Sequence, residues 1–308
     1  GRKQDTRRKM KIENRLIREL INEFIGTMIL VLIGDSILAV IIAGDNEKLA
    51  PIVGPVGWGT AIFVAVTIAG GVSAHLNPAV TLALASTKKF PINKVPLYFG
   101  VQYLGAFVGA SLVYLLYHDQ IANFDGGVRQ ITGKQGTAPI FATYPREHVS
   151  TLTCFFDQLV GTGILMLTAE AITDPRNFGG MPKHLHPLAL GLMIMALIFG
   201  FSYNCMAPLN PARDIGPRIF TAIAGWGTEV FTYRNWNYIW VPIFGPHLGA
   251  IMGAWIYKVG IGDNFPDDEP KLSGDLERGK VAELQEGAYR PIDDKLNLEA
   301  HTNDALKL

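Results

Sequence analysis

Hydrophobic residues along this chain gather in six long runs, separated by segments rich in polar residues, glycine or proline. Each run approaches the roughly 20 residues that an α-helix needs to cross the hydrocarbon core of a bilayer. The pattern therefore predicts an all-α membrane protein with six transmembrane helices. The predicted spans are Ile21–Ala43, Val56–Gly71, Val95–Tyr117, Thr151–Thr173, Pro187–Met206 and Ile239–Gly260.

Two shorter apolar stretches, Val80–Ser86 and Ile219–Ala224, each follow a copy of the motif Asn-Pro-Ala. Asparagine is a good helix N-cap, and proline fits the first helical position because its missing N–H costs nothing there. Each motif therefore starts a helix that is too short to span a bilayer, so we expect two re-entrant half-helices. The two motifs are Asn77-Pro78-Ala79 and Asn210-Pro211-Ala212.

The two halves of the chain share further features in the same order. Glu23–Thr27 matches Gln158–Thr162, and Leu104–Ala110 matches Leu248–Ala254, where small residues allow close packing within the bundle or between protomers. Each half holds three spans, an odd number, so the second half enters the membrane from the opposite side. Irregular backbone at the midplane survives only when protein buries it or when it lines a wet cavity. The sequence thus predicts an inverted repeat built around a pore.

Charge is distributed unevenly, although the formal net charge is zero. Residues 1–18 carry eight Lys or Arg, Lys88, Lys89 and Lys94 follow the first half-helix, and the segment after Ile261 is mainly acidic. Basic segments favour the cytoplasmic side of a membrane, so six spans place both termini there. The first apolar run is long enough to remain as an anchor, so we expect no cleaved signal peptide.

Residues with catalytic or metal-binding chemistry are sparse. Cys154 and Cys205 fall inside or at the end of predicted spans and suggest neither a disulfide framework nor a metal site. The sequence shows no catalytic constellation and implies no nucleic-acid surface. We therefore expect a protein that is not an enzyme, with no cofactor and no nucleic-acid partner.

Four motifs carry a resemblance to a known family. They are Ala74-His-Leu-Asn-Pro-Ala-Val80, Gly136-Thr-Ala-Pro-Ile-Phe-Ala-Thr-Tyr-Pro145, Asn210-Pro-Ala-Arg-Asp-Ile-Gly-Pro-Arg218 and Ala224-Gly-Trp-Gly227. Residues 19–262 resemble the aquaporin family, and in particular its glycerol-conducting branch, the aquaglyceroporins. Asp214 directly after Arg213, and the long loop between the third and fourth spans, are typical of that branch. The resemblance implies a passive channel for water and glycerol that excludes ions and protons, with urea and other small neutral solutes as further candidates.

The resemblance assigns the narrowest point of the pore, the selectivity filter, to four positions. Arg213 offers five donors and a permanent positive charge that repels cations, and Trp58 offers an apolar face to a carbon skeleton. The alternatives are a structural ion pair of Arg213 with Asp214, and a lipid-facing or interfacial Trp58. At the other two positions the chain departs from the usual pattern. Ala207 stands where many relatives have an aromatic residue and is expected to widen the filter, whereas Ile198 stands where glycine is usual and is expected to narrow it, so the sequence leaves the net width open.

The resemblance also implies how the half-helices act. Two helix N-termini, each carrying about half a positive charge, meet at Asn77 and Asn210, disfavour a cation there, and leave both amides free to donate to a passing oxygen. Glu23 and Gln158 are expected to support the re-entrant backbone by accepting its hydrogen bonds, and Asp214 is a further structural support. Backbone carbonyls along one wall of the pore are expected from Ala74, His75, Leu76, Met206, Ala207, Pro208 and Leu209.

Two further carboxylates, Asp35 in the first span and Glu170 near the end of the fourth, suggest a second function class. A secondary transporter of a small polar solute could use Asp35, Glu23 or Glu170 for proton coupling, because intramembrane carboxylates are commonly functional. We favour a structural role for both carboxylates, because Asp35 is expected near the outer end of its span and Glu170 near the inner end of its span. A membrane-junction scaffold with a vestigial pore is the third class.

The chain divides into a basic cytoplasmic N-terminal tail (residues 1–18), a channel domain (19–262) and a cytoplasmic C-terminal tail (263–308). The C-terminal tail alternates charge and lacks apolar residues for a core, so we expect it to be disordered. The family resemblance implies a homotetramer with one pore per subunit, embedded in a lipid bilayer, with the plasma membrane as the expected location.

Overall fold

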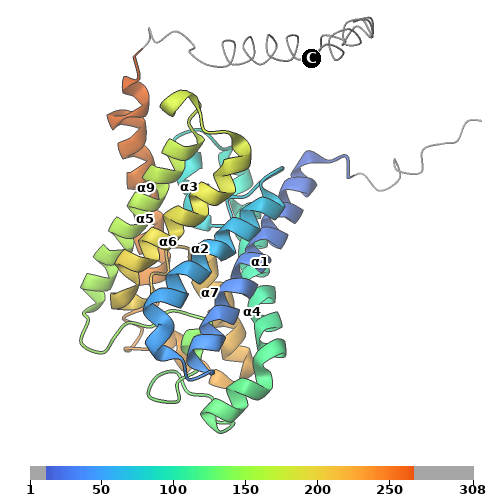
Figure 1. Cartoon of the computed structure of the whole chain (residues 1–308), viewed down its shortest axis with the longest axis vertical. Helices are drawn as coiled ribbons and strands as arrows, with labels where there is room; N and C mark the ends of the chain where they lie inside the picture. Colours follow the sequence, from blue (N-terminus) through green and yellow to red (C-terminus); the bar gives the residue numbers. More distant parts are fainter. Residues whose placement is uncertain (1–11, 267–308) are drawn as a thin grey trace, which may run out of the picture. The chain divides into compact units, whose positions relative to one another are not determined.

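The computed structural model describes residues 12–266, and all regular secondary structure in that range is helical (Figure 1). The predicted all-α architecture is confirmed, with six long helices and two short ones that start at the Asn-Pro-Ala motifs. Most of the two expected tails, residues 1–11 and 267–308, lies outside the described residues. The long helices are α1 Arg15–Ile42, α2 Ala50–Ala69, α4 Val95–Asp125, α5 Thr151–Thr173, α6 His186–Cys205 and α9 Val241–Gly260.

Several helix ends extend beyond the predicted spans. The Asn14 side chain caps α1 by accepting a hydrogen bond from the Ile17 N–H, and α4 continues past Tyr117 to a left-handed Gly126. These extra turns are polar, so an apolar run does not reveal them. Within the described range, five helices combine the length and the hydropathy needed to cross a membrane. The 20-residue α9 is as long as α2 and α6, but Pro246 and its neighbouring glycines and histidine lower its mean hydropathy.

The half-helices are α3 (Pro78–Ser86) and α7 (Pro211–Thr221). Each begins with proline after an asparagine whose side chain caps the helix, as the motif predicts. In Figure 1, α3 lies in the upper part of the bundle and α7 in the lower part. We call the end of the bundle at which α3 terminates the α3 face, and the opposite end the α7 face.

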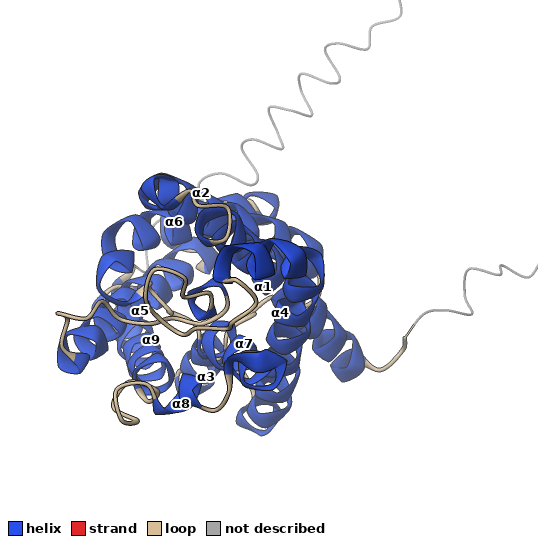
Figure 2. Cartoon of the chain, turned by 90° about the horizontal axis from the view of Figure 1, so that it is seen from below, coloured by secondary structure: helices blue, strands red, loops and turns tan. Residues whose placement is uncertain are grey.

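Equivalent helices pack in the same way in the two halves: α1 lies against α4, and α5 lies against α9. Glycine permits both contacts, because a β-carbon at Gly105 would lie 2.5 Å from the Phe24 carbonyl oxygen of α1. A β-carbon at Gly249 or Gly253 would likewise overlap the backbone of α5. The small-residue segments therefore serve packing within the bundle. Viewed from the α7 face, the long helices surround a centre that loops cross (Figure 2).

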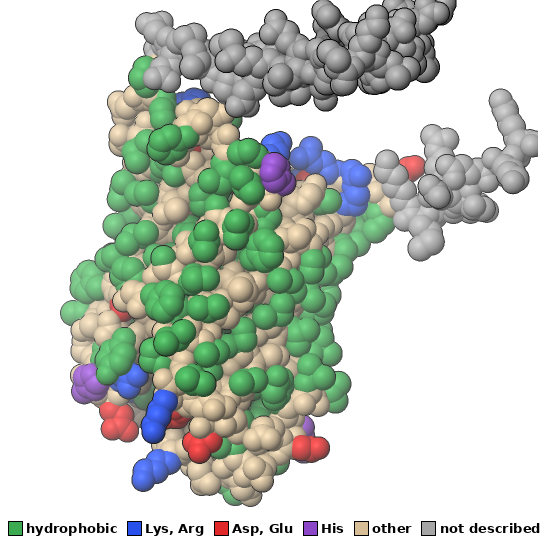
Figure 3. Space-filling model, in the orientation of Figure 1, with side chains coloured by type: hydrophobic (Ala, Val, Ile, Leu, Met, Phe, Trp, Pro, Cys, Tyr) green, Lys and Arg blue, Asp and Glu red, His purple; other side chains and the backbone are tan. Residues whose placement is uncertain are grey.

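The outer surface of the bundle is apolar around its middle and charged at its ends (Figure 3). Large aliphatic side chains such as Leu115, Leu116 and Ile223 are about 70% exposed (74%, 68% and 74%). In water such exposure would be unfavourable, whereas lipid is a suitable solvent for these side chains. The surface is that of a bundle that spans a membrane.

Candidate functional site

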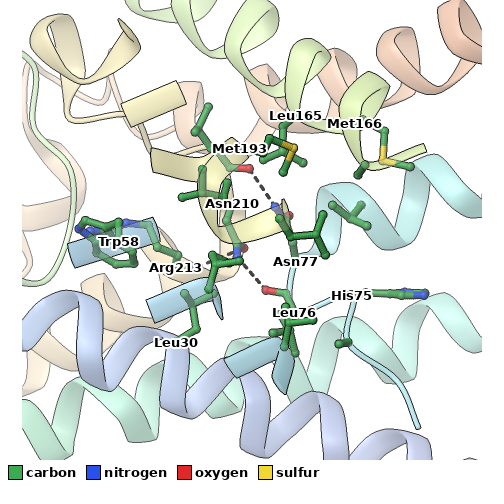
Figure 4. A pocket seen from close by; sticks show the side chains of 18 of the residues that line it. Leu30, Trp58, His75, Leu76, Asn77, Leu165, Met166, Met193, Asn210 and Arg213 are labelled. Carbon is green, nitrogen blue, oxygen red and sulfur yellow. Dashed lines mark hydrogen bonds between the residues drawn. The ribbon is translucent and has the colours of Figure 1, made fainter. Parts of the chain in front are cut away.

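The two re-entrant loops meet inside the bundle through their asparagine side chains (Figure 4). The Nδ2 of Asn77 donates to the Leu209 carbonyl at 2.9 Å, and the Nδ2 of Asn210 donates to the Leu76 carbonyl at 2.7 Å. Each amide oxygen caps its own half-helix. Leu76 and Leu209 adopt left-handed φ angles of 53° and 51°, which are rare outside glycine and cluster at functional sites. Each asparagine thus joins its own helix start to the opposite loop and keeps a second N–H.

A cavity of about 200 Å³ runs beside this junction. Its wall includes both asparagines, all four predicted filter residues and every residue predicted to line the pore with carbonyls. These residues are Trp58, Ala74, His75, Leu76, Asn77, Ile198, Met206, Ala207, Pro208, Leu209, Asn210 and Arg213. The other motif residues, Pro78, Ala79, Pro211 and Ala212, are buried in the first turns of the half-helices. Most of the remaining wall is aliphatic, so a few polar groups lie among apolar side chains.

Three groups hold the guanidinium of Arg213 near the α7 end of the cavity. Its Cζ lies 4.3 Å from the centroid of the Trp58 ring, and Nη1 donates to the Phe141 carbonyl at 3.0 Å. Nη2 lies 3.6 Å from a carboxylate oxygen of Asp35, which is fully buried. The ring, the carbonyl and the carboxylate fix the guanidinium, and its remaining N–H groups are available to a solute oxygen.

The considered ion pair between Arg213 and Asp214 is absent from the described residues, because Asp214 pairs with Arg218 at 2.8 Å instead. Asp214 and Arg218 are one helical turn apart and share a face of α7, whereas adjacent residues point in different directions. Asp214 accepts the backbone N–H of Thr143 at 2.8 Å, and Arg218 donates to the Thr143 carbonyl at 2.7 Å. This pair therefore clamps the loop that presents the Phe141 carbonyl to the filter, a geometry that supports the structural role expected of Asp214.

Trp58 faces the interior of the bundle, since only 7% of it is exposed, so the lipid-facing interpretation is wrong. Gly34 of α1 makes this orientation possible, because a β-carbon there would overlap the indole ring. Ile198 and Ala207 belong to the same buried apolar cluster as Trp58. The structure thus brings the four predicted filter residues to one cavity from α2, α6, the second re-entrant loop and α7.

Glu23 supports the first re-entrant loop. One carboxylate oxygen accepts hydrogen bonds from the Ser73 hydroxyl at 2.6 Å and the His75 N–H at 2.7 Å. The other accepts from the Leu76 N–H at 2.7 Å and the Gln102 amide at 2.9 Å. A fully buried carboxylate is tolerable here because four donors satisfy it.

Gln158 occupies the equivalent position in the second half but makes different contacts. Its Oε1 accepts the Leu209 N–H at 2.9 Å, and its Nε2 donates to Asp157 at 2.9 Å. The other oxygen of Asp157 accepts from Asn204 of α6 at 2.6 Å. Both predicted supports, Glu23 and Gln158, therefore contact the re-entrant backbone. In the second half the nearby carboxylate belongs to Asp157, the residue before Gln158.

Glu170 lies at the α3 end of the cavity, where its side chain is 2% exposed and forms an ion pair with Lys89. The sequence predicts structural roles for Asp35 and Glu170 but does not identify their partners, which are Arg213 and Lys89. Just beyond α5, hydrogen bonds from Arg176 lower the pKa of Asp174 to about 2. That carboxylate is therefore ionised at any physiological pH.

Residues 12–266 contain no cluster of His, Cys, Asp and Glu arranged to hold a metal ion. Cys154 and Cys205 are both buried and both free. The polar groups of the cavity wall are the amides of Asn77 and Asn210, the backbone of the re-entrant loops, the guanidinium of Arg213, the His75 imidazole, the Thr173 hydroxyl and the carboxylate of Glu170, which pairs with Lys89. Such groups can bind and orient a neutral solute through hydrogen bonds.

Comparisons with known proteins agree with this geometry. The family model described as "Major intrinsic protein" matches residues 10–257. The chain is 41% identical to Aquaporin-9 of Homo sapiens over 264 residues, covering 85% of this chain and 89% of that relative. It is 39% identical to Aquaporin-10 of Homo sapiens over 279 residues, covering 90% and 92%. The X-ray structure of the aquaglyceroporin from Plasmodium falciparum superposes with a TM-score of 0.72 at 34% identity, covering 80% of this chain and 98% of that one. The chain belongs to the major intrinsic protein family and is a multi-pass membrane protein.

Proposed function

We propose that this protein is a passive channel for water and glycerol, with urea and other small neutral solutes as further permeants. The observation that carries the proposal is the reciprocal contact of the two half-helix starts beside a continuous cavity that reaches a buried arginine. Two helix N-termini and a guanidinium repel cations, while amides, carbonyls and an apolar wall suit a polyol. The likeness to the aquaglyceroporin structure supports the same assignment.

Each group in the cavity has a proposed task. Arg213 and the amides of Asn77 and Asn210 donate hydrogen bonds to solute oxygens, and Trp58 contacts the carbon skeleton. Ile198 and the small Ala207 set the aperture beside them. No enzymatic step is assigned, because the lining side chains offer no nucleophile with an adjacent base.

We assign the pore to residues 19–262, with a basic tail before it and a C-terminal tail after it. We also propose a homotetramer in the plasma membrane with both termini cytoplasmic, so that the α3 face is the inner one. The basic residues near the start of α1 and after α3 support this orientation. Crosslinking in membranes and protease protection of tagged termini test these two assignments.

Initial uptake of labelled glycerol into proteoliposomes tests the channel against a transporter. Flux is expected to rise linearly with glycerol concentration and to ignore an imposed pH step, because Asp35 lies beside Arg213 and is not among the described residues that line the cavity. Stopped-flow light scattering with water, glycerol and urea gradients then ranks the permeants. Saturation together with proton coupling would contradict the channel, and the absence of any swelling would favour a scaffold.

A further inference from the structure

The α3 end of the cavity holds a carboxylate whose placement needs an explanation. Glu170 lies in the last turn of α5, where the negative end of the helix dipole disfavours an anion. Its side chain is 98% buried and lines the cavity with Ala169 and Thr173. An acidic group in a membrane span at a helix C-terminus is costly, so structure alone does not favour it.

The two oxygens of this carboxylate have different surroundings. Oε2 forms the ion pair with Lys89, which follows α3, whereas the buried Oε1 accepts no hydrogen bond from any described residue. Lys89 compensates the charge, so the pair does not draw cations into the pore. A buried acceptor without a donor is unfavourable, and a charged oxygen is a strong acceptor once an O–H reaches it.

Backbone carbonyls of the re-entrant loops supply acceptors in the middle of the cavity, but the charged and amide side chains there and at the α7 end are donors. Arg213 at the α7 end and the amides of Asn77 and Asn210 in the middle are side-chain donors. Among the described lining residues, Glu170 is the one carboxylate. A polyol must give up hydrogen bonds that its hydroxyl hydrogens make to water when it enters, and Glu170 is the side chain suited to replace one of them.

We infer that Glu170, neutralised by Lys89, is a hydroxyl-binding subsite for polyols at the α3 mouth of the pore. The inference rests on the proposed function, since it concerns the same solute. Here the Oε1 of Glu170 accepts a hydrogen bond from a glycerol hydroxyl and lowers the barrier to entry. Water, which loses fewer hydrogen bonds on entry, gains less from the same contact.

Two matched double variants separate this role from that of a structural ion pair. Lys89→Met/Glu170→Gln and Lys89→Met/Glu170→Leu both lack the ion pair and both have neutral side chains of similar size. They differ in the amide at position 170, whose oxygen keeps an acceptor for a solute hydroxyl. The ratio of glycerol to water permeability in proteoliposomes is expected to be roughly three- to tenfold higher in the glutamine variant, which is the range for one net hydrogen bond.

Equal ratios in the two double variants would overturn the subsite and leave the proposed function intact. A wild-type protein that conducts no glycerol would instead overturn the proposed function. Should the double variants fail to fold, an experimental structure of the wild-type protein in glycerol decides the question. The expected result is a glycerol oxygen within hydrogen-bond distance of Glu170 Oε1, and a Lys89 ammonium bridging both carboxylate oxygens would refute the inference.

Discussion

The two halves of the inverted repeat hold their re-entrant loops by different means. In the first half, the carboxylate of Glu23 accepts four hydrogen bonds. In the second half, the neutral Gln158 accepts one from the loop backbone and donates to its neighbours. The charge of the half-helices is distributed the other way round. The half-helix of the first half, α3, has no charged residue, whereas α7 in the second half contains Arg213, Asp214 and Arg218.

This contrast separates the features that the two repeats share from the charged residues in which they differ. The duplicated backbone provides two capped helix starts that meet beside one cavity. Buried charge is costly unless it is paired. Four donors satisfy Glu23 in the first half, whereas on α7 Asp214 pairs with Arg218 of the same helix and with the Thr143 backbone, and Arg213 lies beside Asp35 of α1. In the proposed function, the symmetric part makes the pore and the asymmetric part makes it selective at one end.

Replacing Glu23 with Gln makes the first support resemble the second and is expected to have the largest effect. An amide offers one acceptor oxygen, so at least one of the two backbone N–H donors, from His75 or Leu76, loses its partner. An orphaned buried donor costs about 1–3 kcal/mol, and its loop carries Asn77. Thermal unfolding in detergent is expected to shift downward and glycerol flux to fall severalfold. A variant with wild-type stability and flux would show that the charge is dispensable.

Replacing Arg213 with Val gives the second Asn-Pro-Ala motif the same following residue as the first, which is followed by Val80. The change removes the fixed charge at the filter and leaves Asp35 buried without its cation. Small cations are expected to leak under voltage, which supplies about 2.3 kcal/mol per charge for each 100 mV, while the half-helix termini limit the current. Voltage-clamped cells measure this leak.

The double variant Arg213→Val/Asp35→Asn is the matched control, since it removes the uncompensated carboxylate as well. A leak in the single variant that disappears in the double variant would assign the current to Asp35, whereas a leak in both assigns selectivity to Arg213. No current in either variant, at normal surface expression and swelling, would leave charge selectivity to Asn77 and Asn210.

These experiments also mark the limit of the sequence. The spans, the half-helices and their approach from opposite sides follow from hydropathy, capping and the inverted repeat, whereas the meeting of the two asparagines and the filter positions are implied by the family resemblance. The partnership of Asp35 with Arg213, and the Phe141 carbonyl beside them, join segments that are distant in the chain. Local patterns cannot report such contacts, and the adjacent Asp214 was the misleading candidate because helix geometry directs it to Arg218.

Ala207 and its first-half counterpart Ala74 test whether the filter is confined to one half. Both line the cavity, but Ala207 shares a buried cluster with Trp58 and Ile198. Ala207→Phe is expected to reduce glycerol permeability severalfold more than water permeability, because the wider solute meets the added ring first. Ala74→Phe is the control and should change the ratio less. Equal changes in the ratio, measured by stopped-flow light scattering, would place the size limit outside the filter.

Replacing Gln158 with Glu completes the comparison with the smallest expected effect. The new carboxylate keeps an acceptor for the Leu209 N–H. Its second oxygen replaces the Nε2 donor of Gln158 and places a negative charge beside Asp157. Repulsion between adjacent carboxylates is expected to cost about 1 kcal/mol of stability, with glycerol permeability changed less than twofold. Adding Asp157→Asn removes the repulsion and should restore the thermal midpoint. If Gln158→Glu alone is neutral, the second half does not require an uncharged support. If the double variant stays destabilised, the lost stability comes from the contact of residue 158 with the second re-entrant loop. The two halves would then differ in how the support fits the loop backbone rather than in charge.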